Sequence, residues 1–171
     1  DIGAELKNPD EVRSFYRQML VSSGIGMIAC DVVSFLGTDA VKLIAKAPIE
    51  PTGFVFLASI TIPFRDFSFV LKCQGVEEGM TGIRESVVME KSIRDEVVKE
   101  EDGTIAGWAQ DPYDPKLKYD VMRILADDQK WDTEFPDHPL SRARSFLGDL
   151  ASTTQISQTV LTSPKFGEPI G

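Results

Sequence analysis

The sequence predicts an α+β fold in which a central antiparallel sheet is covered by an N-terminal and a C-terminal helix. Amphipathic stretches lie near both ends of the chain, and short β-branched and aromatic runs separated by turn residues follow the first of them. The 171 residues are 42% hydrophobic and 26% charged, a composition typical of globular proteins. We therefore predict that residues 1–171 form a single globular domain with one core.

The first predicted helix covers residues 9–22. Asn8 precedes it as a cap, a proline occupies the first helical position, and Glu11 stands at capping-box spacing from Asn8. The predicted apolar face consists of Val12, Phe15, Tyr16, Met19 and Leu20. Because such a face needs cover, the helix is expected to lie on the sheet with Phe15 and Met19 buried.

Four strands are predicted next, over residues 27–35, 40–47, 54–62 and 67–74. The first two flank the turn residues 37–39 and so form a hairpin. Pro48, Pro51 and Pro63 end strands, because proline has no amide proton to donate to a ladder. The phenylalanines of residues 54–69 invite a cofactor-stacking interpretation, but their alternation favours a filled core.

The second half of the chain is acidic and less regular. A helix over residues 81–98 is predicted from the stripe of Ile83, Val87, Ile93 and Val97. A C-terminal helix over residues 139–151 is predicted from Leu140, Ala143, Leu147, Leu150 and Ala151, with Asp137 or His138 as its cap. Residues 99–118 are loop-like, residues 117–125 fit a helix or a strand equally well, and residues 163–171 are expected to be irregular.

Charge and cysteine content exclude several classes of protein. Lys and Arg number 18 against 27 Asp and Glu, and the net charge of −9 argues against nucleic acid and anionic lipid as partners. No apolar run reaches the roughly 20 residues of a membrane span, and Asp1 begins no targeting pattern. Cys30 and Cys73 lack the spacing of a redox or zinc pair, so a reducing, cytoplasmic location is expected.

The single histidine, His138, is the first candidate for catalysis because Asp137 and Ser141 lie near it. A Ser-His-Asp triad is disfavoured, since neighbouring residues at a helix start point in different directions. One histidine and two distant cysteines disfavour zinc, and the many acids lack the calcium-loop pattern. Arg84, at a helix start, is expected to pair with Glu77, Glu78 or Glu85. The sequence thus predicts no catalytic residue, no metal site and no cofactor.

Three stretches carry a resemblance: TIPFRDFSFVLKCQ (61–74), TGIRE (81–85) and FPDHPLSRARSFL (135–147). With the order of elements, the chain resembles the α/β/α sandwich of PsbP-like and DcrB-like proteins, and the three stretches are similar to bacterial proteins of unassigned function. The resemblance implies an assembly factor, an adaptor or a binding module without a catalytic set. Many exported relatives carry a signal peptide or lipoprotein cysteine that these residues do not show, so a role in the cell envelope is not expected.

The sequence therefore predicts a non-enzymatic protein-binding module, acting as an adaptor, an assembly factor or a toxin-neutralising protein. Two alternatives stay open: a small hydrolase using His138 with nearby acids, and a small-ligand-binding protein with a pocket lined by the phenylalanines of residues 54–69. The predicted contact surface consists of Trp108, Asp111, Tyr113 and Asp114. Its aromatic residues would anchor a protein partner and its acids would steer a basic one.

Overall fold

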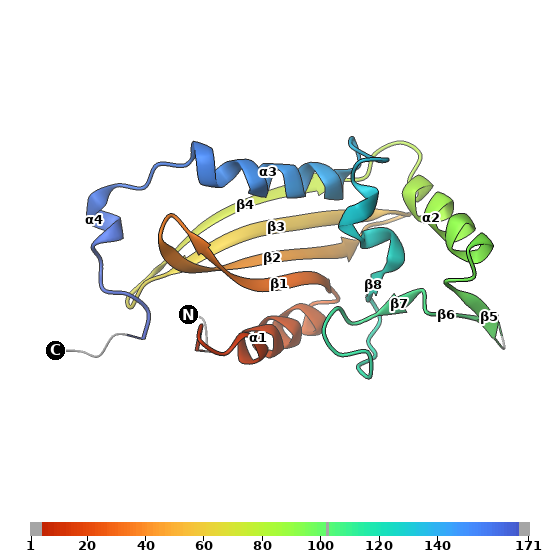
Figure 1. Cartoon of the computed structure of the whole chain (residues 1–171), viewed down its shortest axis with the longest axis horizontal. Coiled ribbons are helices and arrows are strands. Elements are labelled where there is room, and N and C mark those ends of the chain that lie inside the picture. Colours follow the sequence, from red (N-terminus) through yellow and green to blue (C-terminus); the bar gives the residue numbers. More distant parts are fainter. Residues whose placement is uncertain (1–4, 102, 168–171) are drawn as a thin grey trace.

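A four-stranded antiparallel sheet runs through the molecule, with a helix packed on each of its faces (Figure 1). This structure, a computed structural model, describes residues 5–101 and 103–167. The strands follow one another in chain order as β1 (Gly26–Phe35), β2 (Thr38–Pro48), β3 (Phe54–Pro63) and β4 (Ser68–Val76). The α+β class is confirmed, and each predicted strand ends within two residues of its observed bounds.

Helix α1 (Pro9–Ser22) covers one face and packs mainly on β1. The predicted cap is present, because Asn8 Oδ1 accepts the Glu11 N–H at 3.4 Å while Asn8 Nδ2 donates to Glu11 Oε1 at 2.7 Å. The buried cluster on this face comprises Val12, Tyr16, Leu20, Met27, Cys30, Val41 and Ala45.

The predicted burial of Met19 is wrong, since 46% of this residue is exposed. Phe15 is only partly buried at the margin of the cluster. The buried side chains of α1, Val12, Tyr16 and Leu20, are four positions apart and so lie on one face of the helix. Phe15 and Met19 lie beside this face.

Helix α3 (Pro139–Thr153) covers the opposite face, over β3 and β4. The larger buried cluster lies between them, and its members include Ile44, Phe56, Ile60, Ile62, Phe64, Leu140, Ala143, Leu147 and Leu150. The predicted burial of Leu147 and Leu150 is confirmed. Phe56 and Phe64 fill the core as expected, whereas Phe67 and Phe69, near the edge strand β4, are exposed.

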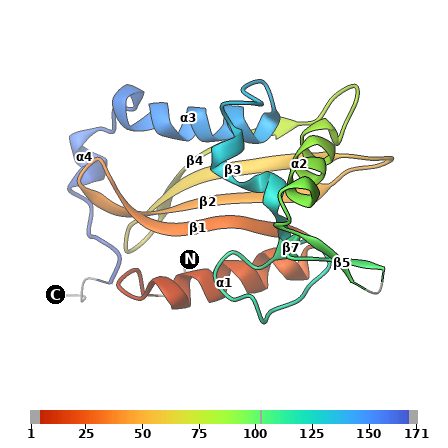
Figure 2. The same ribbon diagram turned by 45° about the vertical axis from the view of Figure 1, so that its right-hand side comes forward.

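The acidic half gathers at one end of the sheet (Figure 2). Its elements are α2 (Ile83–Arg94), β5 (Lys99–Glu101), β6 (Thr104–Ala106), β7 (Ala109–Gln110), β8 (Arg123–Ile124) and the 3₁₀ turns η1 (Leu125–Asp127) and η2 (Gln129–Trp131). Residues 117–125, for which helix and strand were both open, are irregular apart from β8 and the start of η1.

The buried face of α2 differs from the predicted stripe. Arg84, Val88 and Ser92 are buried, whereas Ile83 and Ile93 are exposed. The helix is thus rotated so that an arginine, rather than the isoleucines, points inward.

Near the C-terminus, α4 (Gln158–Leu161) is a short helix that the sequence did not predict. Residues 163–167 are irregular as expected, and residues 168–171 of that prediction lie outside the described residues. No helix within the described ranges is long and apolar enough to cross a membrane.

Candidate functional site

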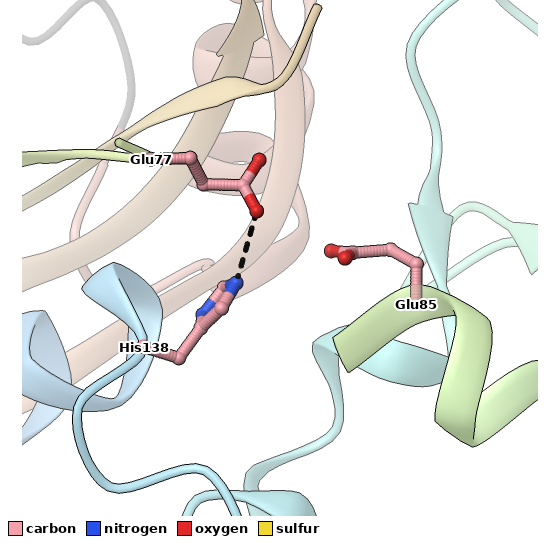
Figure 3. Close-up of side chains that lie close together, drawn as sticks. All are labelled: Glu77, Glu85 and His138. Atoms are coloured by element: carbon pink, nitrogen blue, oxygen red, sulfur yellow. Dashed lines mark ion pairs between the residues drawn. The ribbon is translucent and has the colours of Figure 1, made fainter. Parts of the chain in front are cut away.

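Three titratable side chains meet at the end of the sheet where the acidic half packs: Glu77, Glu85 and His138 (Figure 3). Glu77 directly follows β4, Glu85 lies in the first turn of α2, and His138 is the N-cap residue of α3. One potential ligand atom from each lies within 4.8 Å of the other two. Three separate elements therefore converge on one point.

Glu77 is held rigidly, with its side chain only 6% exposed. Its Oε2 accepts the Phe54 N–H at 2.8 Å, and its Oε1 accepts the Gly82 N–H at 3.3 Å. Burial alone would raise the pKa of Glu77, but the His138 imidazole and these two N–H groups outweigh it and lower the pKa. Glu77 is therefore a fixed, ionised carboxylate.

His138 is also buried, with 8% of its side chain exposed and its ring edge-on to Phe56. Its Nδ1 accepts the Leu140 N–H at 3.2 Å, so the cap prediction is confirmed for His138. This contact turns Nε2 toward Glu77 Oε1, at 3.5 Å. Nε2 makes no hydrogen bond to any residue that the structure describes.

Glu85 completes the group from the other side. Its Oε2 is buried and likewise lacks a hydrogen-bond partner among the described residues. Burial raises the pKa of Glu85, and the charge of Glu77 raises it further, while the backbone N–H of Glu85 itself offsets only part of the shift. Burial and the nearby Glu77 thus disfavour the charged form of Glu85, although His138 acts in the opposite direction.

A pocket of about 520 Å³ adjoins Glu85. Its apolar wall includes Phe54, Met89, Trp108, Met122 and Ile124. Its polar lining includes two acids, Glu85 and Asp120, and one basic residue, Lys46. Such a mixture of apolar wall and a few polar groups is typical of binding pockets.

The basic residue of this pocket is already paired. Lys46 Nζ lies 2.6 Å from Asp127 Oδ2, and both side chains are buried. The same Oδ2 accepts the Ile124 N–H at 2.9 Å. The charge of Lys46 is therefore neutralised within the fold, and the acids of the pocket are left uncompensated.

Arg84 anchors the elements that carry the site. Its guanidinium donates to the carbonyl oxygens of Ala126 and Asp128, to Ser141 Oγ and to Asp132 Oδ1, at 2.6 to 3.0 Å. The expected pairing with a neighbouring acid is wrong, because the acid that Arg84 contacts is the distant Asp132. Arg84 thereby joins α2 to η1, η2 and α3.

The predicted contact surface divides into structural and accessible residues. Asp111 is only 2% exposed, so its expected role as a steering surface charge is wrong. The groups that donate to its carboxylate are Arg17 Nε and Nη2, the N–H groups of Tyr113 and Asp114, and the Tyr119 hydroxyl. Asp111 therefore holds its loop against α1.

Tyr113, a predicted anchor for a partner, instead anchors its own loop to β1. Its hydroxyl donates to Asp31 Oδ1 at 3.0 Å and accepts the Cys30 N–H at 2.7 Å, and Arg13 lies over its ring. Trp108 is partly buried and lines the pocket. Asp114 is partly buried, and its contact with a partner stays a prediction.

Replacing Asp111 with asparagine is expected to lower the free energy of unfolding at pH 7 by about 2 kcal/mol, because the charge opposite Arg17 is lost. Burial would raise the pKa of Asp111, but the hydrogen bonds from Arg17, the two backbone N–H groups and Tyr119 lower it. The contribution is therefore complete above the ordinary carboxyl pKa and is lost as the pH falls through the lower, folded-state pKa.

Thermal unfolding of Asp111→Asn and the original chain across the acid range checks this expectation, with the exposed Asp120→Asn as control. The difference in melting temperature between Asp111→Asn and the original chain should become smaller as the pH falls. Equal stability of the two proteins at pH 7 would contradict the structural role.

No family model, curated protein or solved structure shows a significant match to this chain. Its function must therefore be inferred from the geometry of its own residues. The sequence suggested His138 as a candidate for catalysis and Glu77 and Glu85 as partners of Arg84, and it gave no sign that the three side chains meet. The pocket was also missed, because Lys46, Met89 and Trp108 come from distant segments.

Proposed function

We propose that this chain is a non-enzymatic protein-binding module whose 520 Å³ pocket receives a lysine or arginine side chain of a basic partner protein. The observation that carries the proposal is the charge pattern of the pocket. Two acids, Glu85 and Asp120, line it without a basic residue to pair with, since Lys46 is bound to Asp127.

The chemistry of the wall suits such a side chain. A lysine or arginine has an apolar stem, which matches Met89 and Met122, and a cationic head, which is attracted to the face of an indole such as Trp108. The head would also donate a hydrogen bond to Glu85 Oε2, which has no hydrogen-bond partner among the described residues. The net charge of −9 would speed the approach of a basic partner.

Hydrolysis through His138 has less support. Ser141 Oγ accepts from Arg84 and donates to Asp132, and Nδ1 of His138 caps α3, so both groups have structural partners other than each other. A pocket made by the phenylalanines of residues 54–69 also has less support, because Phe56 and Phe64 fill the core and only Phe54 reaches the pocket. The two free cysteines suit the proposed bacterial cytoplasm.

A peptide array tests the proposal. Peptides with a central lysine or arginine between randomised positions are compared with arrays that carry norleucine or glutamate at the centre. Norleucine matches the stem of lysine but lacks the charge. We expect the lysine and arginine peptides to bind, and the norleucine and glutamate peptides to bind at least about tenfold more weakly, as the loss of a desolvated cation–π contact implies.

Pocket variants locate the binding. Trp108→Ala is expected to weaken the selected peptides about tenfold in calorimetry, and Asp120→Asn to weaken them about threefold. Asp149→Asn removes an exposed carboxylate on α3, outside the pocket lining, and should have no effect. Equal binding of norleucine peptides, or unchanged affinity in Trp108→Ala, would show the proposal to be wrong. Binding of free arginine as tightly as the peptides would favour a small-ligand protein instead.

A further inference from the structure

We infer that Glu77, Glu85 and His138 form a binding site for one divalent transition-metal ion, at the junction of β4, α2 and α3. Glu85 also lines the proposed partner pocket, but the inference does not require a partner to bind there. It rests on the spacing of the three side chains, on their burial and on the kinds of donor atom they offer.

The spacing of Glu77 and His138 suits shared coordination better than a direct hydrogen bond. The 3.5 Å between Glu77 Oε1 and His138 Nε2 is long for a hydrogen bond. It is close to the separation of about 3.4 Å between two ligands of a tetrahedral ion with bonds of about 2.05 Å. Glu85, which is only partly buried, can approach the ion by rotating its side chain from the first turn of α2.

Two buried polar atoms at this point lack hydrogen bonds. His138 Nε2 belongs to a side chain that is 8% exposed, and Glu85 Oε2 faces it across the cluster. A buried polar atom without a partner costs stability. One cation between Nε2, Glu85 and the fixed Glu77 would satisfy both atoms and offset the repulsion between the two carboxylates.

The donor set selects the class of ion. One imidazole nitrogen and two carboxylate oxygens suit borderline ions such as Zn²⁺ and Co²⁺, whereas Mg²⁺ and Ca²⁺ prefer oxygen ligands alone. Three protein ligands leave at least one position of the ion open. A second pocket, of about 350 Å³, adjoins the site, because Glu77 and His138 are among the residues that line it.

Metal binding would change the contact of His138 with its helix. While Nδ1 accepts the Leu140 N–H, the neutral ring carries its proton on Nε2. Coordination through Nε2 requires that proton to move to Nδ1, so the Leu140 N–H loses its acceptor. The ion therefore replaces a helix-cap hydrogen bond of 3.2 Å with a coordinate bond.

Cobalt binding to the full chain tests the site. We expect one Co²⁺ per chain with a visible d–d absorption spectrum, displaced by Zn²⁺ and not by an excess of Mg²⁺. His138→Asn keeps a good helix cap but lacks the imidazole nitrogen, and it should bind Co²⁺ at least about a hundredfold more weakly. Glu85→Gln should lose affinity similarly, and Glu78→Gln, an exposed acid beside Glu77, is the matched control.

Circular dichroism of the metal-free variants checks that each is folded before titration. If His138→Asn is not folded, the loss of Co²⁺ affinity is measured in Glu85→Gln alone. Absence of a Co²⁺ spectrum in the original chain would overturn the inference. So would an affinity in both site variants equal to that of the original chain, a loss in Glu78→Gln as large as that in the site variants, or displacement of Co²⁺ by Mg²⁺. The peptide pocket shares Glu85 with the metal site, but its Trp108 and Asp120 are not metal ligands and His138 is not part of its lining, so Trp108→Ala and His138→Asn test the two proposals separately.

Discussion

Replacing Arg84 with alanine is expected to lower the free energy of unfolding by about 3–5 kcal/mol, the cost of breaking a buried ion pair from one side. Arg84 is 1% exposed, and its removal leaves Ser141 Oγ, Asp132 and two backbone carbonyls without this donor. Because these acceptors lie on η1, η2 and α3, the loss weakens the packing of the acidic half on the sheet. Urea unfolding followed by circular dichroism measures the change.

Arg84→Lys should recover less than half of the free energy of unfolding that Arg84→Ala loses. Its ammonium is a single charged point, whereas the guanidinium reaches four acceptors at once in a fixed plane. Arg94→Ala, on the same helix, is the control, since Arg94 is exposed and the acids that pair with it among the described residues, Glu90 and Asp95, are exposed too. Equal stabilities of the Arg84 and Arg94 variants would contradict the anchoring role.

The sheet and its two main helices could be predicted from the sequence because their signals are local. Asn8, Pro9 and Glu11 define the start of α1 without reference to the rest of the chain, and Pro48 and Pro63 coincide with the ends of β2 and β3. A strand also shows its two faces in its own alternation. The confirmed elements are those whose boundaries depend on neighbouring residues.

The buried face of α2 could not be predicted in this way. Val87 and Val88 are adjacent, and both a stripe through Val87 and one through Val88 are possible on a helix. Counting apolar residues favours the stripe with Ile83 and Ile93, but Arg84 finds its acceptors in distant segments and rotates the helix the other way. The hydrogen bonds of Arg84 that set the orientation of α2 are polar and join distant segments, so hydrophobic periodicity does not reveal them.

The candidate site was missed for the same reason. Glu77, Glu85 and His138 each have an ordinary local role at the end of a strand or the start of a helix. Only the arrangement of β4, α2 and α3 brings them within 4.8 Å. Asp111 was mistaken for a surface charge because Arg17, its partner, lies in the first helix, far from it in sequence.

The buried pair of Lys46 and Asp127 should show the second large effect on stability. Lys46→Met is expected to lower the free energy of unfolding by about 3–5 kcal/mol, because the Asp127 carboxylate stays buried and loses the ammonium, while the Ile124 N–H still donates to it. The double variant Lys46→Met/Asp127→Asn removes both charges at nearly constant shape. It should be more stable than Lys46→Met alone.

A double-mutant cycle over these variants measures the coupling between the two residues. We expect a coupling of at least about 2 kcal/mol that changes little with salt, because the pair is shielded from solvent. The exposed pair of Glu90 and Arg94 gives the reference, with a coupling of about 0.3–0.5 kcal/mol that weakens as salt rises.

The same cycle bears on the pocket. If Lys46 and Asp127 are strongly coupled, the ammonium is committed to the fold and Glu85 and Asp120 determine the charge that a ligand meets. A coupling near zero would mean that Lys46 is available to a ligand, and the pocket would then suit an anion as well as a cation. Strong coupling is therefore required for the preference for basic side chains, and its absence would remove the physical basis of that preference.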